Sequence, residues 1–158
     1  IMKLISAYKT RQVTVTGGEP LAQKNCRHLL TMLCDEGYDV SLETSGALDI
    51  QDIDCRVARI VDLKTPASGE VDKNLYSNLR HLTTSDQVKF VICGRGDYQW
   101  STEKLTEYKL NDQCEVLFSG SYGEIQPSQL ADWILADQLP VRLQIQLHKY
   151  LWGDVSGK

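Results

Sequence analysis

Apolar and polar residues follow two alternating patterns along this chain. Short runs rich in Val, Ile and Leu are separated by longer stretches in which apolar residues recur every three or four positions. The first pattern is typical of strands and the second of amphipathic helices. Strands are predicted over 11–16, 38–43, 57–63, 87–92, 114–118 and 141–147. Helices are predicted over 21–36, 71–82, 98–109 and 127–137.

Alternation of strands and helices indicates an α/β fold with a parallel sheet and right-handed crossovers. The first helix has an apolar stripe through Leu29, Leu30 and Leu33, and Gly37 is a typical C-terminal stop. We find no internal repeat or linker, so residues 1–158 are interpreted as a single domain. A full eight-unit barrel needs about 250 residues. The pattern therefore predicts either an open twisted sheet or a partial barrel.

The composition is that of a soluble globular protein, with 42% apolar and 24% charged residues. A net charge of -4 argues against a general nucleic-acid binder. The sequence contains neither a signal peptide nor an apolar run of the roughly 20 residues that a membrane span needs. The five cysteines form no Cys-x-x-Cys pair, which indicates reduced thiols and a cytoplasmic protein.

Unusual polar and small residues follow the predicted strands. They are Thr16 to Glu19, Glu43 to Gly46, Asp62 and Lys64, Ser119 to Tyr122, and His148. The carboxyl ends of parallel strands meet at one edge of a sheet, where α/β folds bind ligands. The sequence therefore predicts a binding cleft at this edge.

The Gly17-Gly18 pair ends the first strand, and Pro20 suits the first turn of the following helix. Glycine allows unusual backbone angles and lets a ligand approach the main chain. Carbonyl groups in such a turn can accept hydrogen bonds from an ammonium group. A tight turn without a ligand is the alternative interpretation of this pair.

The run Thr16-Gly17-Gly18-Glu19-Pro20-Leu21 resembles the Gly-Gly-Glu motif of radical S-adenosylmethionine (SAM) enzymes. Four more stretches follow in the order of the 7-carboxy-7-deazaguanine synthase family of the queuosine pathway: Glu43–Gly46, Ile60–Pro66, Gln87–Ile92 and Leu147–Leu151. The resemblance spans nearly the whole chain. It implies a partial, cut-down (β/α) barrel with a mostly parallel six-stranded sheet.

The resemblance also implies site residues. Those implied for SAM are Gly17, Gly18, Glu19, Asp62, Leu63, Lys64, Ser119, Gly120, Ser121 and Tyr122, and those implied for the substrate are Thr16, Glu43, His148 and Lys158. Lys64 would meet the methionine carboxylate. Many relatives carry Ser-Pro-Lys where this chain has Asp62-Leu63-Lys64, so Asp62 and Leu63 would contribute through their backbone. No catalytic residue is assigned.

Each of these stretches also has a purely structural interpretation. Thr16 could cap a turn, Gly46 could supply a positive φ, and Asp62 with Lys64 could form a surface ion pair. The stretch from Ser119 could be an ordinary strand-to-helix turn. A lone histidine is often structural, and a chain end usually frays.

The family binds its [4Fe–4S] cluster through three cysteines in a loop that precedes the Gly-Gly-Glu motif, with the Mg²⁺ ligand beside them. The cysteines here, at 26, 34, 55, 93 and 114, do not form such a loop, so no metal ligand is predicted in this chain. The chain begins with Ile1, and residues 1–5 resemble the end of a helix. We therefore expect an N-terminally truncated domain that lacks its cluster-binding unit and is inactive by itself.

For the complete protein, the resemblance implies a carbon–nitrogen lyase. With SAM, a [4Fe–4S] cluster and Mg²⁺, it would convert 6-carboxy-5,6,7,8-tetrahydropterin to 7-carboxy-7-deazaguanine. The implied partners are an electron donor such as flavodoxin and a second copy in a homodimer, with neither nucleic acid nor membrane. Another small radical SAM enzyme, such as a glycyl-radical activase, is one alternative. A non-catalytic module that binds nucleotide-like ligands is another.

Overall fold

The computed structural model describes residues 1–153 and 155. It contains a six-stranded sheet, and every neighbouring pair of strands is parallel. The strands are β1 (Gln12–Val15), β2 (Asp39–Thr44), β3 (Ala58–Leu63), β4 (Gln87–Ile92), β5 (Glu115–Gly120) and β6 (Arg142–Gln144). The α-helices are α1 (Met2–Ile5), α2 (Cys26–Asp35), α3 (Arg95–Glu107), α4 (Pro127–Ala136) and α5 (Leu147–Trp152). The predicted α/β class with a parallel six-stranded sheet is confirmed.

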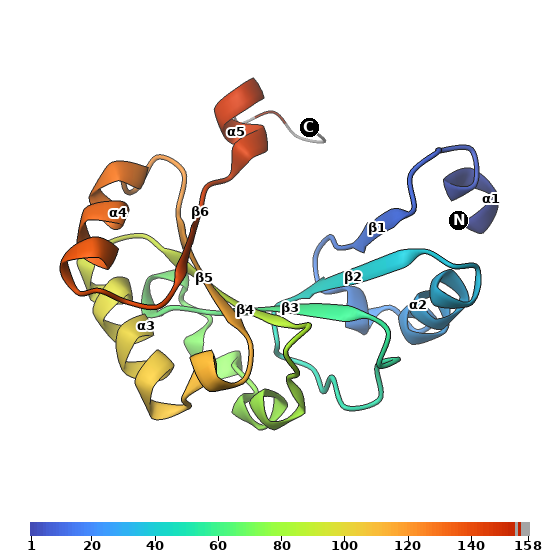
Figure 1. The fold of residues 1–158 in the computed structure, drawn as a ribbon, viewed down its shortest axis with the longest axis horizontal. Coiled ribbons are helices and arrows are strands. Elements are labelled where there is room, and N and C mark those ends of the chain that lie inside the picture. Colours follow the sequence, from blue (N-terminus) through green and yellow to red (C-terminus); the bar gives the residue numbers. More distant parts are fainter. Residues whose placement is uncertain (154, 156–158) are drawn as a thin grey trace.

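The strand order β1-β2-β3-β4-β5-β6 is the order of the chain. Right-handed crossovers between successive neighbours place all the connections on one face of the sheet. Figure 1 shows α2, α3 and α4 outside a curved sheet, with α1 and α5 at its two ends. Within the described residues β1 pairs only with β2, and β6 only with β5, so the sheet is not closed. This arrangement is the partial barrel that the resemblance implied.

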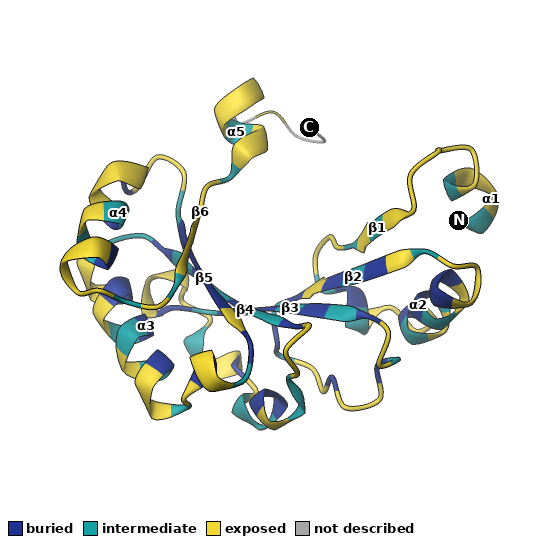
Figure 2. Cartoon of the chain, in the orientation of Figure 1, coloured by how far each residue is buried: buried dark blue, intermediate teal, exposed yellow. Residues whose placement is uncertain are grey.

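The core lies between the sheet and the outer helices. It is built by alternate residues of the central strands, with helix residues packed on them: Val40, Leu42, Val61, Leu63, Val88, Phe90, Phe118, Leu30, Leu33, Tyr98 and Leu130. The Phe90 and Phe118 rings pack edge to face, with 5.6 Å between their centroids. Figure 2 shows the buried residues concentrated on the central strands and α5 largely exposed. Burying each large apolar side chain contributes about 1.5–3 kcal/mol.

The predicted helix over 21–36 is wrong at its start. Pro20–Ala22 forms a short 3-10 turn, Gln23 is extended, and α2 begins only at Cys26. The Glu19 side chain accepts a hydrogen bond from the Leu21 N–H and so caps the short turn. The chain therefore makes one turn at the sheet edge before the helix begins.

The predicted helix over 71–82 is also wrong. The structure has two 3-10 turns, Val71–Lys73 and Tyr76–His81. Asn74 and Asn78 are buried, and their side-chain amides bond to backbone groups of other loops. Side-chain bonds of this kind compete with helical ones, and they hold this connection against the sheet.

The predicted strand over 141–147 is too long. β6 pairs with β5 only from Arg142 to Gln144, and α5 begins at Leu147. All three β6 residues are exposed, because β6 is an edge strand of the described sheet. His148 consequently lies on a helix and not at a strand end.

Candidate functional site

The Gly17-Gly18 turn follows β1 with both residues at positive φ, +104° and +59°. A Cβ atom added at either glycine would meet nothing within 4 Å. Glycine is therefore needed here for the backbone conformation and not for lack of space. The unusual backbone angles predicted for this pair are confirmed, and a main-chain contact with a ligand stays a prediction.

Glu19 joins this turn to the end of β2. The Thr44 hydroxyl lies 2.9 Å from both Glu19 carboxylate oxygens, the Ser45 N–H donates to Oε2 at 2.8 Å, and the Leu21 N–H donates to Oε1 at 3.0 Å. Burial alone would raise the pKa of Glu19, but the hydrogen bonds from Ser45, Leu21 and Thr44 hold that pKa below its ordinary value. Glu19 is therefore an ionised clamp between two loops of the site.

The stretch that follows β2 turns at Gly46, whose φ is +71°. An added Cβ would lie 2.7 Å from Val61 Cγ1, so this position requires glycine both for its conformation and for space. Thr44 is buried, whereas Glu43 is exposed on the opposite face of the strand. Glu43 and the exposed Thr16 thus remain accessible near the Gly-Gly turn.

Lys64 and Asp62 form an ion pair at the end of β3. Lys64 Nζ donates to Asp62 Oδ2 at 2.8 Å, while Asp62 Oδ1 is buried and without a partner among the described residues. The Lys64 backbone N–H and carbonyl each bond to the Asn74 side chain at 2.9 Å, which fixes this loop. The Leu63 side chain is buried in the core. Of these three strand-end residues, only Asp62 and Lys64 have side chains that are partly exposed.

The stretch Ser119–Tyr122 does not begin after the strand, as predicted, because β5 extends to Gly120. The Ser119 side chain is buried, and its hydroxyl has no partner in the described part of the chain. Gly120, Ser121 and Tyr122 line a pocket of about 600 Å³ together with Gln146 and Tyr150. The structure thus joins this stretch to α5.

His148 is exposed on α5, and Lys158 lies outside the described residues. One residue that the sequence reasoning passed over is Lys89, which interrupts the apolar strand from Gln87 to Ile92. A charge in the middle of a central strand was the signal that could have identified it. The face of the sheet on which it lies becomes clear only from the strand register.

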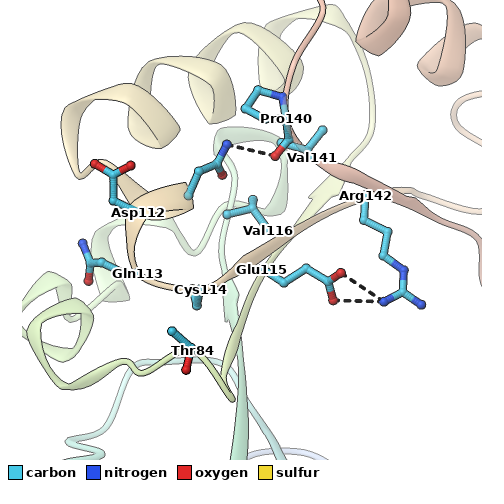
Figure 3. Close-up of a pocket in the computed structure, with 10 residues that line it drawn as sticks. Thr84, Asp112, Gln113, Cys114, Glu115, Val116, Pro140, Val141 and Arg142 are labelled. Atoms are coloured by element: carbon cyan, nitrogen blue, oxygen red, sulfur yellow. Dashed lines mark hydrogen bonds and ion pairs between the residues drawn. The ribbon is translucent and has the colours of Figure 1, made fainter.

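A second pocket, of about 680 Å³, lies at the amino ends of β5 and β6, away from the predicted edge (Figure 3). Its ion pair is already formed, with Arg142 Nη1 donating to Glu115 Oε2 at 3.0 Å. Asn111 Nδ2 donates to the Pro140 carbonyl at 2.9 Å. Burial raises the pKa of the Cys114 thiol to about 11. The pocket therefore has an ion pair and a thiol that is neutral at ordinary pH, and it lies away from the edge where the predicted site residues gather.

Among residues 1–153 and 155, no three His, Cys, Asp or Glu side chains gather in a way that could hold a metal ion. All five cysteines are free, as predicted, and burial raises the thiol pKa of Cys26, Cys34, Cys93 and Cys114. The described residues therefore do not fit an iron–sulfur cluster. Each described helix is too short or too polar to cross a membrane.

No protein-family model matches the chain. Sequence relatives and solved structures with a similar fold do match it. The 7-carboxy-7-deazaguanine synthase of Chlorobaculum tepidum is 38% identical over 161 residues, which cover 99% of this chain and 73% of that protein. The synthase of Koribacter versatilis is also 38% identical, over 89% of this chain and 68% of its own length.

Two solved structures share the fold. QueE from Escherichia coli matches with a TM-score of 0.70 and 21% identity over 92% of this chain and 61% of that one. Streptococcus suis SuiB bound to S-adenosylmethionine matches with a TM-score of 0.53 and 14% identity over 85% of this chain and 38% of that one. The fold agrees with both, and the sequence relatives carry a single name. The chain therefore belongs to the 7-carboxy-7-deazaguanine synthase family.

Proposed function

We propose that residues 1–158 form one radical SAM-type α/β domain of a 7-carboxy-7-deazaguanine synthase, a carbon–nitrogen lyase acting on 6-carboxy-5,6,7,8-tetrahydropterin. Relatives with that name align along almost the entire chain. The observation that carries the proposal is the gathering of the Gly17-Gly18 turn, the Asp62–Lys64 pair and the Ser119–Tyr122 stretch at the carboxyl ends of one parallel sheet.

The residues at this edge fit SAM. The Gly17-Gly18 turn would offer main-chain groups to the methionine ammonium, and the Lys64 ammonium at the end of β3 would meet the methionine carboxylate. The pocket beside Ser121 and Tyr122 can accept the adenine. When bound, SAM together with a reduced [4Fe–4S] cluster supplies the one-electron chemistry that removes a hydrogen from the pterin. The described residues do not fit the cluster, so we give none of them a role in a reaction step at the cluster.

The substrate would lie beside the cofactor. Glu43 carries an exposed carboxylate that can accept N–H groups of the pterin ring, and Thr16 offers a hydroxyl next to the Gly-Gly turn. His148 on α5 has ring nitrogens that can donate or accept a hydrogen bond. Lys158 is part of the same proposal although it lies outside the described residues. These side chains would bind and orient the substrate.

Several finer features come from the family resemblance alone. We propose Mg²⁺ as the ion that holds the substrate carboxylate, because hard cations prefer oxygen ligands. We also propose a flavodoxin-like electron donor, a homodimer and a cytoplasmic location.

The test is turnover by the full-length protein, purified anaerobically and supplied with SAM, a reductant and 6-carboxy-5,6,7,8-tetrahydropterin. The expected product, 7-carboxy-7-deazaguanine, is identified by mass spectrometry. Lys64→Met should lower turnover, while Lys109→Met, a change on the turn after α3, should not. Consumption of SAM without this product, accompanied by a glycyl radical on a partner protein, would instead favour the activase alternative. Ligand binding without any SAM cleavage would favour a non-catalytic module.

A further inference from the structure

Lys89 lies near the middle of the open face of the sheet. It belongs to β4, where its Cα pairs with Asp62 on β3 and with Leu117 on β5. Its neighbours Val88 and Phe90 are fully buried in the core beneath the helices. Because side chains alternate along a strand, Lys89 points to the opposite face, which the outer helices do not cover.

The charge of Lys89 has no partner among the residues that the structure describes. Within residues 1–153 and 155 its ammonium makes neither an ion pair nor a hydrogen bond. Asp62 is the carboxylate nearest in register, but its Oδ2 is taken by Lys64. Lys64, the residue at the strand end, thus already has a protein partner, whereas Lys89 has none among the described residues.

Two more polar groups beside Lys89 lack partners. Asp62 Oδ1 is buried and accepts no hydrogen bond from a described residue. Ser119 is only 1% exposed, and its hydroxyl is also unpaired within the described chain. Val91 and Ser119 are paired in the strand register, which places Ser119 on the same face as Lys89, one row nearer the carboxyl edge. Buried polar groups without partners are unusual and need an explanation.

A ligand could satisfy all three groups together. A carboxylate would match the Lys89 ammonium, an N–H of the same ligand would match Asp62 Oδ1, and a polar atom would match the Ser119 hydroxyl. We propose that Lys89 is a binding and specificity residue for a ligand carboxylate on the open face of the sheet, with Asp62 Oδ1 accepting a hydrogen bond from the same ligand. This inference rests on the proposed function and adds a residue to it.

Both ligands of the proposed reaction carry this chemistry. The methionine end of SAM has a carboxylate beside its ammonium, and 6-carboxy-5,6,7,8-tetrahydropterin has a carboxylate beside ring N–H groups. The experiment therefore pairs each ligand with an analogue that lacks the carboxylate: decarboxylated SAM in the first pair and 6-methyl-5,6,7,8-tetrahydropterin in the second.

Dissociation constants for these four compounds are measured by calorimetry on the full-length, cluster-loaded protein. The variants are Lys89→Met and Lys89→Gln, which remove the charge, and Lys89→Arg, which keeps it. Lys109→Met is the matched control, because Lys109 is exposed on the turn that follows α3. Circular dichroism shows whether each variant is folded. Two neutral variants are made so that the test still works if one of them does not fold.

In one of the two pairs, the wild type is expected to prefer the carboxylated ligand by roughly 10- to 100-fold, the range for a charge-assisted hydrogen bond. The neutral variants should lose that preference by binding the carboxylated ligand more weakly, while Lys89→Arg and Lys109→Met keep it. The pair in which the preference collapses identifies the ligand. If the neutral variants keep the wild-type preference in both pairs, Lys89 does not recognise a carboxylate. If the wild type binds neither ligand of the reaction, the proposed function itself fails, and this inference with it.

Discussion

The Thr44 hydroxyl lies 2.9 Å from each of the two carboxylate oxygens of Glu19, which ties the Gly-Gly turn after β1 to the end of β2. Ser45 strengthens the same connection through its backbone N–H. Two segments that are separate in the sequence are therefore hydrogen-bonded to each other at the candidate site. Glu19 holds the open turn in place through bonds that its carboxylate has already made.

Replacing Glu19 by Gln should loosen this connection. The amide presents an NH₂ group where an oxygen now accepts hydrogen bonds, so at least one donor loses its partner. We expect the free energy of unfolding to fall by about 1–3 kcal/mol, as measured by urea denaturation. Glu43→Gln is the control, because Glu43 is exposed. Equal stability of the two variants would contradict the clamp.

The buried pair between Arg59 and Asp86 should be the most sensitive ion pair. Arg59 Nη2 lies 2.6 Å from Asp86 Oδ2, and the side chains are 9% and 0% exposed. Asp86 also accepts from the backbone N–H groups of Arg59 and Thr83. Asp86→Ala would leave a buried guanidinium unpaired, at an expected loss of about 3–5 kcal/mol in denaturant unfolding.

The exposed pair between Arg56 and Asp35 provides the control for this measurement, since its side chains are 47% and 62% exposed. Asp35→Ala should change the free energy of unfolding by less than about 1 kcal/mol. If the two aspartate variants lose the same stability, burial does not set the strength of these pairs.

The same Asp86 carboxylate predicts how stability depends on pH. Burial would raise the pKa of Asp86, but the bonds from Arg59 and Thr83 outweigh it and lower that pKa. A group whose folded pKa is depressed stabilises the protein above its unfolded pKa and loses that effect as the pH falls through the folded pKa. The stability difference between the wild type and Asp86→Asn should therefore shrink in acid, from about pH 5 downwards. A difference that grew with acidity would mean that the pKa is raised instead.

Alanine substitutions at Gly46 and Gly69 distinguish the cost of backbone strain from the cost of a steric clash. Their φ angles are +71° and +69°, but a Cβ at Gly46 would lie 2.7 Å from Val61 Cγ1, whereas one at Gly69 meets nothing within 4 Å. Gly69→Ala should lose about 1 kcal/mol through backbone strain alone. Gly46→Ala should lose more, because the Val61 side chain must also move. Thermal unfolding of both variants measures the difference, and equal losses would show that the clash is relieved without cost.

Much of the framework could be predicted from local sequence alone. β4 begins and ends at the predicted residues, Gln87 and Ile92, because a buried strand carries its own β-branched and apolar signal. Gly46 has the positive φ that its turn required. Polar residues after the apolar strands indicated the carboxyl edge, since parallel strands must all end there. The resemblance to the family, and not the local pattern, implied that the ligands are SAM and a pterin.

Other features depended on residues far away in the chain. Asn74 and Asn78 changed a predicted helix into 3-10 turns, because their side chains found backbone partners on the loops after β2 and β3. Glu19 became a clamp only because the sheet placed Thr44 beside it.

Lys89 shows the same limit at the candidate site. Alternation along β4 predicts that the side chains of Lys89 and Val88 point to opposite faces of the sheet. It does not say which of the two faces the helices cover. Sequence by itself determined where the strands lie and where glycine was needed, because those preferences are local to the backbone. The tertiary structure decided which polar groups found distant partners and which have none among the described residues, because hydrogen bonds between loops form only when the strands are assembled.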